Sequence, residues 1–113
     1  MTTGSRRAFV HTAELVLLWD TPAEAPGAAV TEALCGAVEH EPPCRWPHHS
    51  AIGPVSRPAL FRTVFVATDV EEQEVRDRID VALRSSDAWT LRASGPGVLH
   101  VDERELAERL ARS

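Results

Sequence analysis

The sequence predicts an α+β fold in which a four-stranded antiparallel sheet carries two helices on one face. Two observations support this prediction. Segments with apolar residues at every second position alternate with segments whose apolar residues recur every three to four positions. The chain has 113 residues, of which 43% are hydrophobic, and both values are typical of one globular domain. We therefore expect a disordered N-terminus over residues 1–7 and a single α+β domain over 8–113.

The first strand is predicted over residues 8–20, because alternate side chains from Phe9 to Trp19 share one largely apolar face. The second half of this segment is apolar on both faces, which is typical of a central strand. A helix is expected next, from Pro26, a residue suited to the first helical turn, to about Glu39. Two prolines that follow shortly afterwards end this helix.

The middle of the chain joins a proline-rich segment to a strongly alternating one. Prolines recur between residues 45 and 59, so we expect a loop there with a short edge strand near 50–55. Residues 60–68 predict another strand, because Phe61, Thr63, Phe65 and Ala67 share one face and Val64 and Val66 lie on the other. Asp69 and Glu72 have the spacing of a capping box, which indicates that a second helix begins at this point.

The last third of the chain predicts one more strand and one more helix. The strand is expected over residues 88–94 and is broken by the Gly-Pro-Gly run at 95–97. Asp102 and Glu105 form a second capping-box pattern, from which a helix extends to about Ala111. The resulting order is the βαββαβ pattern of a ferredoxin-like sandwich with an added C-terminal helix.

Charge and hydropathy argue against several classes of partner. The net charge is −5, and all twelve basic residues are arginines without any clustered patch, so no nucleic-acid partner is expected. No apolar run reaches the roughly 18 residues that cross a membrane, and the first residues lack the apolar core of a signal peptide. We therefore expect a cytoplasmic protein, whose two cysteines would be thiols or metal ligands rather than a disulfide.

One short segment, residues 35–49, contains both cysteines and three of the five histidines. Cys35, His40, Cys44 and His48 follow the spacing C-x4-H-x3-C-x3-H, and His49 could replace one of the histidines. Zinc prefers such sulfur and imidazole ligands in tetrahedral geometry. The segment therefore predicts a possible zinc site, although zinc fingers usually bring their ligands in closer pairs.

Three other interpretations of this segment stay open. Cys35 lies within the predicted helix, where a buried free cysteine acts as a small hydrophobe. Cys35 and Cys44 could form a disulfide, against which only the expected compartment argues. Cys44 could act as a nucleophile beside the histidines, but it follows a helix C-terminus, whose dipole disfavours a thiolate.

Two surfaces are candidates for function. Arg45 and Trp46 follow the histidine- and cysteine-bearing segment, and an exposed Trp46 would mark a partner surface. Alternatively, Trp46 folds down over the edge of the sheet. His11 and Trp19 lie on the first strand and could line a pocket on an open sheet face, with His11 as a weak candidate for a catalytic residue.

The sequence contains no phosphate-binding glycine loop, dinucleotide fingerprint, zinc-protease motif or serine-hydrolase motif, so whether the chain is an enzyme is uncertain. We interpret it as a small cytoplasmic binding or accessory module, with residues 35–49 as a partner surface that zinc could organise. The alternative is a cofactor-free small enzyme, or an enzyme subunit, with a pocket on the open sheet face. A homodimer or another protein partner is expected, because an open sheet face has to be covered.

Overall fold

The computed structural model describes residues 5–36, 45–53 and 57–112 of the chain. Within these ranges, four strands and three α-helices confirm the predicted α+β class. The elements are β1 (Arg7–Leu17), α1 (Ala25–Cys35), β2 (His48–Ile52), β3 (Ala59–Ala67), α2 (Glu72–Arg84), β4 (Trp89–Gly97), a 3₁₀ turn (Val101–Glu103) and α3 (Arg104–Ala111). Residues 1–4 of the predicted disordered N-terminus lie outside the described residues.

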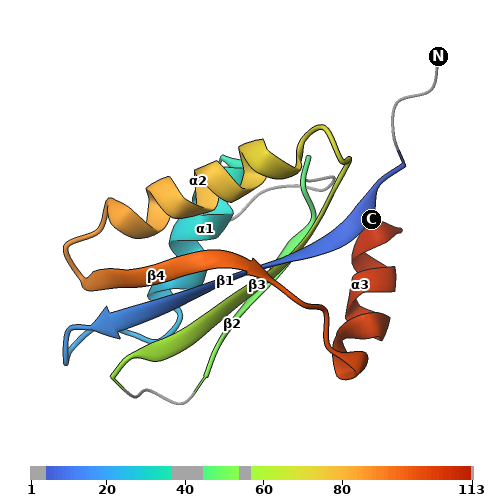
Figure 1. Ribbon diagram of the computed structural model, residues 1–113. Coiled ribbons are helices and arrows are strands. Elements are labelled where there is room, and N and C mark those ends of the chain that lie inside the picture. Colours follow the sequence, from blue (N-terminus) through green and yellow to red (C-terminus); the bar gives the residue numbers. More distant parts are fainter. Residues whose placement is uncertain (1–4, 37–44, 54–56, 113) are drawn as a thin grey trace.

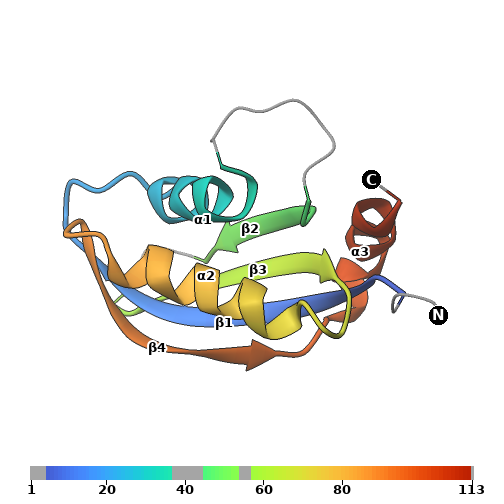
Figure 2. The ribbon, with the colours of Figure 1, turned by 90° about the horizontal axis from the view of Figure 1, so that it is seen from above.

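The four strands form one antiparallel sheet in the order β2-β3-β1-β4. β3 lies between β1 and β2, and β1 lies between β3 and β4, so β2 and β4 are the two edges of the described sheet. Helices α1 and α2 cover one face, and α3 lies against the other face near one end (Figure 1). Seen from above, α1 lies over the β2 side of the sheet and α2 lies toward the β4 side (Figure 2).

The main core lies between the sheet and the helices α1 and α2. Alternate side chains of β1, from Phe9 to Leu17, face these helices as predicted. Trp19 was predicted to continue this face, but β1 ends earlier and Trp19 is 95% exposed. The cause is a turn that leaves the sheet, closed by the Thr21 N–H donating to the Leu18 carbonyl. The core consists of Phe9, Ala13, Leu15, Leu17, Val30, Leu34, Trp46, Phe61, Phe65, Ala67, Val75, Ile79, Leu83 and Trp89.

A second, smaller core lies on the opposite face of the sheet, beneath α3. It consists of Val10, Val64 and Ala107, flanked by Ala8, Leu99, Leu106 and Leu110. Arg62 of β3 holds the start of α3 in place, because its guanidinium donates to both carboxylate oxygens of Glu103, at 2.6 and 3.2 Å, and to the Val98 carbonyl. The face that the sequence leaves open is therefore partly covered by the chain's own C-terminal helix.

The glycine–proline run at residues 95–97 was predicted to break the last strand. In the structure this run belongs to β4. β4 is an edge strand, where a proline can face away from the ladder. Gly97 pairs with Val10, and a Cβ atom at Gly97 would lie 2.6 Å from the Thr12 side chain. The run is thus a place of close approach between two strands, which a larger residue would not allow.

The second helix has a capping box one position before the predicted one. The Thr68 hydroxyl accepts from the Glu71 N–H, and the Glu71 carboxylate accepts from the Thr68 N–H at 3.1 Å. Asp69 instead accepts from the Arg7 guanidinium. Because threonine and aspartate both serve as cap residues, the sequence pattern alone did not distinguish the two registers.

Candidate functional site: the groove at the β2 edge

A groove of about 460 Å³ runs along the outer edge of β2, beneath α1, and all five residues of β2 line it. Ala23, Glu24, Gly27 and Thr31 line it from α1 and the preceding turn, and Phe61 of β3 completes the lining. We call this feature the edge groove. Its volume lies within the range of roughly 300–1,000 Å³ found for ligand sites.

His48 connects the two walls of the edge groove. Its Nδ1 donates to the Trp46 carbonyl at 3.0 Å, and in the neutral ring its Nε2 accepts from the Thr31 hydroxyl at 2.9 Å. The Cys35 sulfur lies 3.9 Å from the same Nδ1. The imidazole therefore joins α1 to the beginning of β2. Farther along the strand, Ser50, Ala51 and Ile52 line the edge groove.

The backbone of β2 presents polar groups along the outer side of the sheet. The Val66 N–H donates to the Pro47 carbonyl, and the Gly53 N–H donates to the Leu60 carbonyl. Hydrogen-bonded pairs alternate with non-hydrogen-bonded pairs in an antiparallel ladder, so residues 47, 49, 51 and 53 bond toward β3. The residues between them direct their N–H and C=O groups away from β3. These residues are His48, Ser50 and Ile52.

Trp46 leads into β2 and anchors this edge, rather than forming the exposed partner surface that was one of its two predicted roles. Its side chain is only 1% exposed and belongs to the main core. The Arg45 and Arg78 guanidinium groups lie over its ring, at 4.2 and 4.9 Å from the centroid. The sequence allowed that Trp46 folds over the sheet edge, and that alternative is the one the structure shows.

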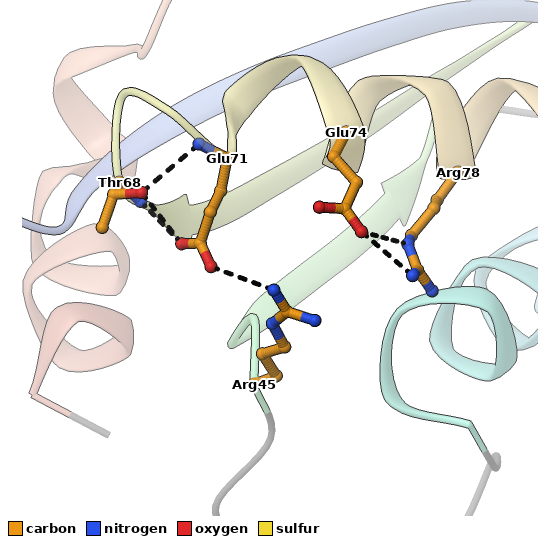
Figure 3. A network of polar contacts seen from close by, with 5 residues as sticks. All are labelled: Arg45, Thr68, Glu71, Glu74 and Arg78. Atoms are coloured by element: carbon orange, nitrogen blue, oxygen red, sulfur yellow. Dashed lines mark hydrogen bonds and ion pairs between the residues drawn. The ribbon is translucent and has the colours of Figure 1, made fainter.

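Both arginines around Trp46 also pair with carboxylates, one in α2 and one immediately before it (Figure 3). Arg78 pairs with Glu74 at 3.0 Å, and Arg45 approaches Glu71 at 3.4 Å. The pKa of Glu71 lies below its usual value, first because of the Thr68 backbone N–H and further because of the Thr68 hydroxyl, Trp46 and Arg45, while burial opposes the shift. This cluster holds the entry to β2 against α2.

The predicted zinc ligands are only partly covered by the structure. His40 and Cys44 lie outside the described residues, and His49 is exposed on β2. Cys35 is disulfide-bonded, contrary to the expectation of a thiol or metal ligand, and a disulfide sulfur is not a thiolate ligand. Among residues 5–36, 45–53 and 57–112, no group of three or more histidine, cysteine or acidic side chains could hold a metal ion. The zinc site stays a prediction.

The enzyme interpretation required His11 to line an open pocket. Instead, the His11 side chain is buried between the sheet and α2, with only 3% of its surface exposed. Its Nδ1 accepts from the Arg76 guanidinium at 3.1 Å, so its Nε2 donates to Asp80 at 2.9 Å. Arg76 also donates to the Val10 carbonyl and to Glu72. His11 therefore belongs to a satisfied network inside the core, away from the edge groove.

The sequence singled out neither Arg76 nor Thr31. Arg76 is buried. The sequence contains an indication of this burial, because Arg76 lies three positions before Ile79 and seven before Leu83, which places all three on the same side of α2. No comparable signal pairs Thr31 with His48, because the contact depends on where α1 crosses β2.

Comparison with known proteins gives no match: no protein-family model, curated protein or solved structure is significantly similar to this chain. Among the described helices, none has the length and apolar character needed to span a membrane. The cytoplasmic location stays a prediction.

Proposed function

We propose that this chain is a small protein-interaction module that binds a partner polypeptide at the edge groove, by adding a strand to β2. The observation that carries the proposal is the outward direction of the backbone groups of Ser50 and Ile52 within a groove that the whole of β2 lines. Strand addition uses outward-directed backbone groups of an edge strand for affinity and neighbouring pockets for specificity.

The proposal keeps the last five residues of the predicted partner surface, residues 45–49, and moves its centre from the loop to the strand that follows. Arg45 and Trp46 then act as anchors of β2 rather than as contacts. We also propose a ferredoxin-like sandwich for the fold, supported by the two split βαβ units, in which β3 separates β1 from β2 and β1 separates β3 from β4. A zinc ion would need ligands that include residues outside the described part of the chain.

The test is site-specific photo-crosslinking in the native host, with a photoreactive side chain at Ala51 on β2 or at Arg92 on β4. Both side chains are exposed, so both can report a neighbour. Covalent adducts are expected from Ala51 and not from Arg92, because a strand added to β2 places its side chains beside Ala51.

A proline at Ser50 supplies the matched control. The Ser50 N–H points away from β3, so Ser50→Pro removes an outward donor without breaking a bond of the intrachain ladder. Ser50→Pro and Ser50→Ala both lose the hydroxyl contact with Thr63, but only the first loses the N–H. Adducts should vanish in Ser50→Pro and persist in Ser50→Ala. Adducts of equal yield at Ala51 and Arg92, or adducts that survive the proline, would contradict the proposal.

A further inference from the structure

We propose that the outer surface of the helix layer carries a second partner site, which binds a basic amphipathic helix of another protein between α1 and α2. Two neighbouring cavities of about 690 and 490 Å³ lie there, and Ala33 and Ala82 line both of them. The cavities therefore form one continuous groove, which we call the helix groove. This inference goes beyond the proposed function and does not depend on it.

Small side chains at the contact between the two helices produce the helix groove. α1 and α2 lie side by side over the sheet and run in opposite directions (Figure 2). Each helix directs its large apolar side chains toward the sheet. Ala29, Ala33 and Ala82 each stand one position before such a buried residue, which turns them by about 100° toward the neighbouring helix. Their methyl groups are too short to fill the outer half of the space between the helices.

The dimensions of the helix groove suit a helix of about three turns. Its lining on the α2 side runs from Gln73 to Ser85. A helix rises about 1.5 Å per residue, so this stretch is about 18 Å long. The backbone groups in the middle of α1 and α2 are bonded within their own helices, which leaves an added strand nothing to pair with. A partner helix satisfies its own backbone and needs only a surface for its side chains.

The floor and one wall of the helix groove are apolar. The three alanines form the floor, and Val81 of α2, which is 55% exposed, stands beside it. Small side chains let a helix approach closely, because the distance between helix axes depends on the side chains at the contact. A partner helix with large apolar residues at a spacing of three and four positions would fill this floor and cover Val81.

Carboxylates along the helix groove define the charge of its partner. Among the described residues, three carboxylates and one guanidinium line it, namely Glu32 on α1 and Glu74, Asp77 and Arg78 on α2. Arg78 pairs with Glu74 at 3.0 Å, so these two charges compensate each other. Asp77 accepts from the Gln73 amide, which is neutral, and neither Asp77 nor Glu32 forms an ion pair within the described residues. Lysine or arginine side chains beside the apolar stripe of the partner would complement these two carboxylates.

The same charges argue against a second copy of this chain as the occupant. A twofold contact between two helix grooves would bring the Glu32 and Asp77 carboxylates of both copies together, and like charges repel. The α3 helix of a second copy does not fit either. Its apolar residues Leu106 and Leu110 already pack against the chain's own sheet.

The helix groove and the edge groove lie on different sides of α1. Glu24, Gly27 and Thr31 line the edge groove, whereas Ala29 and Ala33 line the helix groove. The two sites share none of their lining residues, so substitutions can test each one separately.

The first experiment measures binding of a labelled synthetic peptide to the purified full chain by fluorescence anisotropy. The probe is a helical peptide of about 14 leucine and lysine residues, with the leucines on one stripe and lysines on both sides of it. One control peptide has glutamate in place of every lysine, and another has the same composition in scrambled order. The lysine peptide should bind with a micromolar dissociation constant, at least about tenfold more tightly than either control.

Charge reversal identifies the site. Glu32→Lys combined with Asp77→Lys should weaken binding of the lysine peptide at least about tenfold. Glu105→Lys combined with Glu108→Lys, on α3, changes the net charge equally and is the matched control. It should weaken binding less than about twofold at an ionic strength of about 0.15 M, because salt screens distant charges. All four carboxylates belong to exposed residues, so both double variants should fold, which circular dichroism checks.

A pair of exposed valines tests the apolar contact. Val81→Ala should weaken binding of the lysine peptide about threefold, since it removes part of the wall. Val70→Ala is the control and should have no effect, because Val70 is 90% exposed and lies outside the lining of the helix groove.

Nuclear magnetic resonance locates the peptide without any substitution. Changes in amide chemical shift should be largest at residues 29–33 and 73–85 and small on β2. Ser50→Pro should leave peptide binding unchanged, so failure of the strand-addition proposal and failure of this one are separate outcomes. Equal binding of the lysine and glutamate peptides, no binding at about 1 mM, shifts centred elsewhere, or an equal loss in both charge-reversed variants would overturn the helix-groove inference.

Discussion

The two edges of the sheet, β2 and β4, differ in how they meet solvent. β4 carries the exposed charge of Arg92 and contains Pro96, and its pairing with β1 shifts register between Glu14 and Leu15. Each of these features discourages another strand from pairing. β2 is regular over its five residues, carries no fixed charge and lies beside a groove. Over its five residues, β2 therefore lacks the features that protect β4.

The two edge strands are attached to the core in the same way, so they differ in their surfaces and not in their attachment. Trp46 precedes β2 and Trp89 begins β4, and both side chains are buried in the main core. The Trp89 indole N–H donates to the Leu83 carbonyl at 2.8 Å. Both edges are thus anchored firmly at one end, so the contrast between them lies in their surfaces and not in how strongly they are attached.

The largest expected effect tests this shared anchoring. Trp46→Ala and Trp89→Ala should each lower the free energy of unfolding by about 3–5 kcal/mol, since each removes a buried aromatic side chain. Trp19→Ala is the control and should change it by less than about 0.5 kcal/mol, because Trp19 is exposed. Urea denaturation measures all three. A small effect at Trp46 would show that β2 is loosely held and would break the comparison.

The next effect concerns the end of α1 beside β2. Cys35→Ser removes the disulfide and should lower the free energy of unfolding by about 2–3 kcal/mol, the value for a short closed loop. Denaturation of the unaltered chain with and without a reductant should give the same difference. If the reductant has no effect on the unaltered chain, Cys35 is not held in a disulfide under those conditions.

Glycines near the two edges should respond in opposite directions. Gly97→Ala on β4 should destabilise the fold by about 1–3 kcal/mol, because the added methyl group meets the Thr12 and Val10 side chains. Gly27→Ala on α1 should stabilise it by about 0.5–1 kcal/mol, since its Cβ meets only an ordinary contact at Ser50. Thermal denaturation of the two variants checks the signs. A loss of stability at Gly27 would mean that α1 lies closer to β2 than the structure has it.

The smallest destabilisation accompanies a pH dependence on the far face of the sheet. The Arg62 guanidinium, together with the His100 backbone N–H, lowers the pKa of Glu103, while burial opposes the shift. The carboxylate therefore contributes stability that is present above its unfolded pKa of about 4.5 and is lost as the pH falls through the lower folded value. Glu103→Gln should cost about 1–2 kcal/mol at pH 7 and should flatten this part of the profile. An unchanged acid profile would contradict the assignment.

The alternation of β1 and β3 was sufficient to predict the sheet and the face that carries its core. Proline positions also indicated that the strand after residue 47 lies at an edge. Helix ends were predicted less well, because Thr68 and Asp69 are both competent cap residues and only tertiary contacts decide between them. Which side of the sheet α3 would cover was not encoded in any local pattern.

The candidate site depended on distances that no spacing reveals. The cluster of cysteines and histidines at residues 35–49 led us to predict His48 as a metal ligand. In the structure, its ring joins the Thr31 hydroxyl to the Trp46 carbonyl. His11 lies on the predicted apolar face, and its polar partners come from α2, 65 and 69 positions away. Burial of a polar side chain can be inferred from periodicity, but its partner cannot.

The buried contact between His11 and Arg76 also limits how this sequence can drift. Both side chains are buried and are hydrogen-bonded to each other, so a change at either position removes a hydrogen bond from a buried polar group. A chain that lost the histidine would retain its fold most readily if the arginine became apolar in the same lineage. Related sequences, where they are found, should therefore vary at positions 11 and 76 as a pair, with position 80 following them.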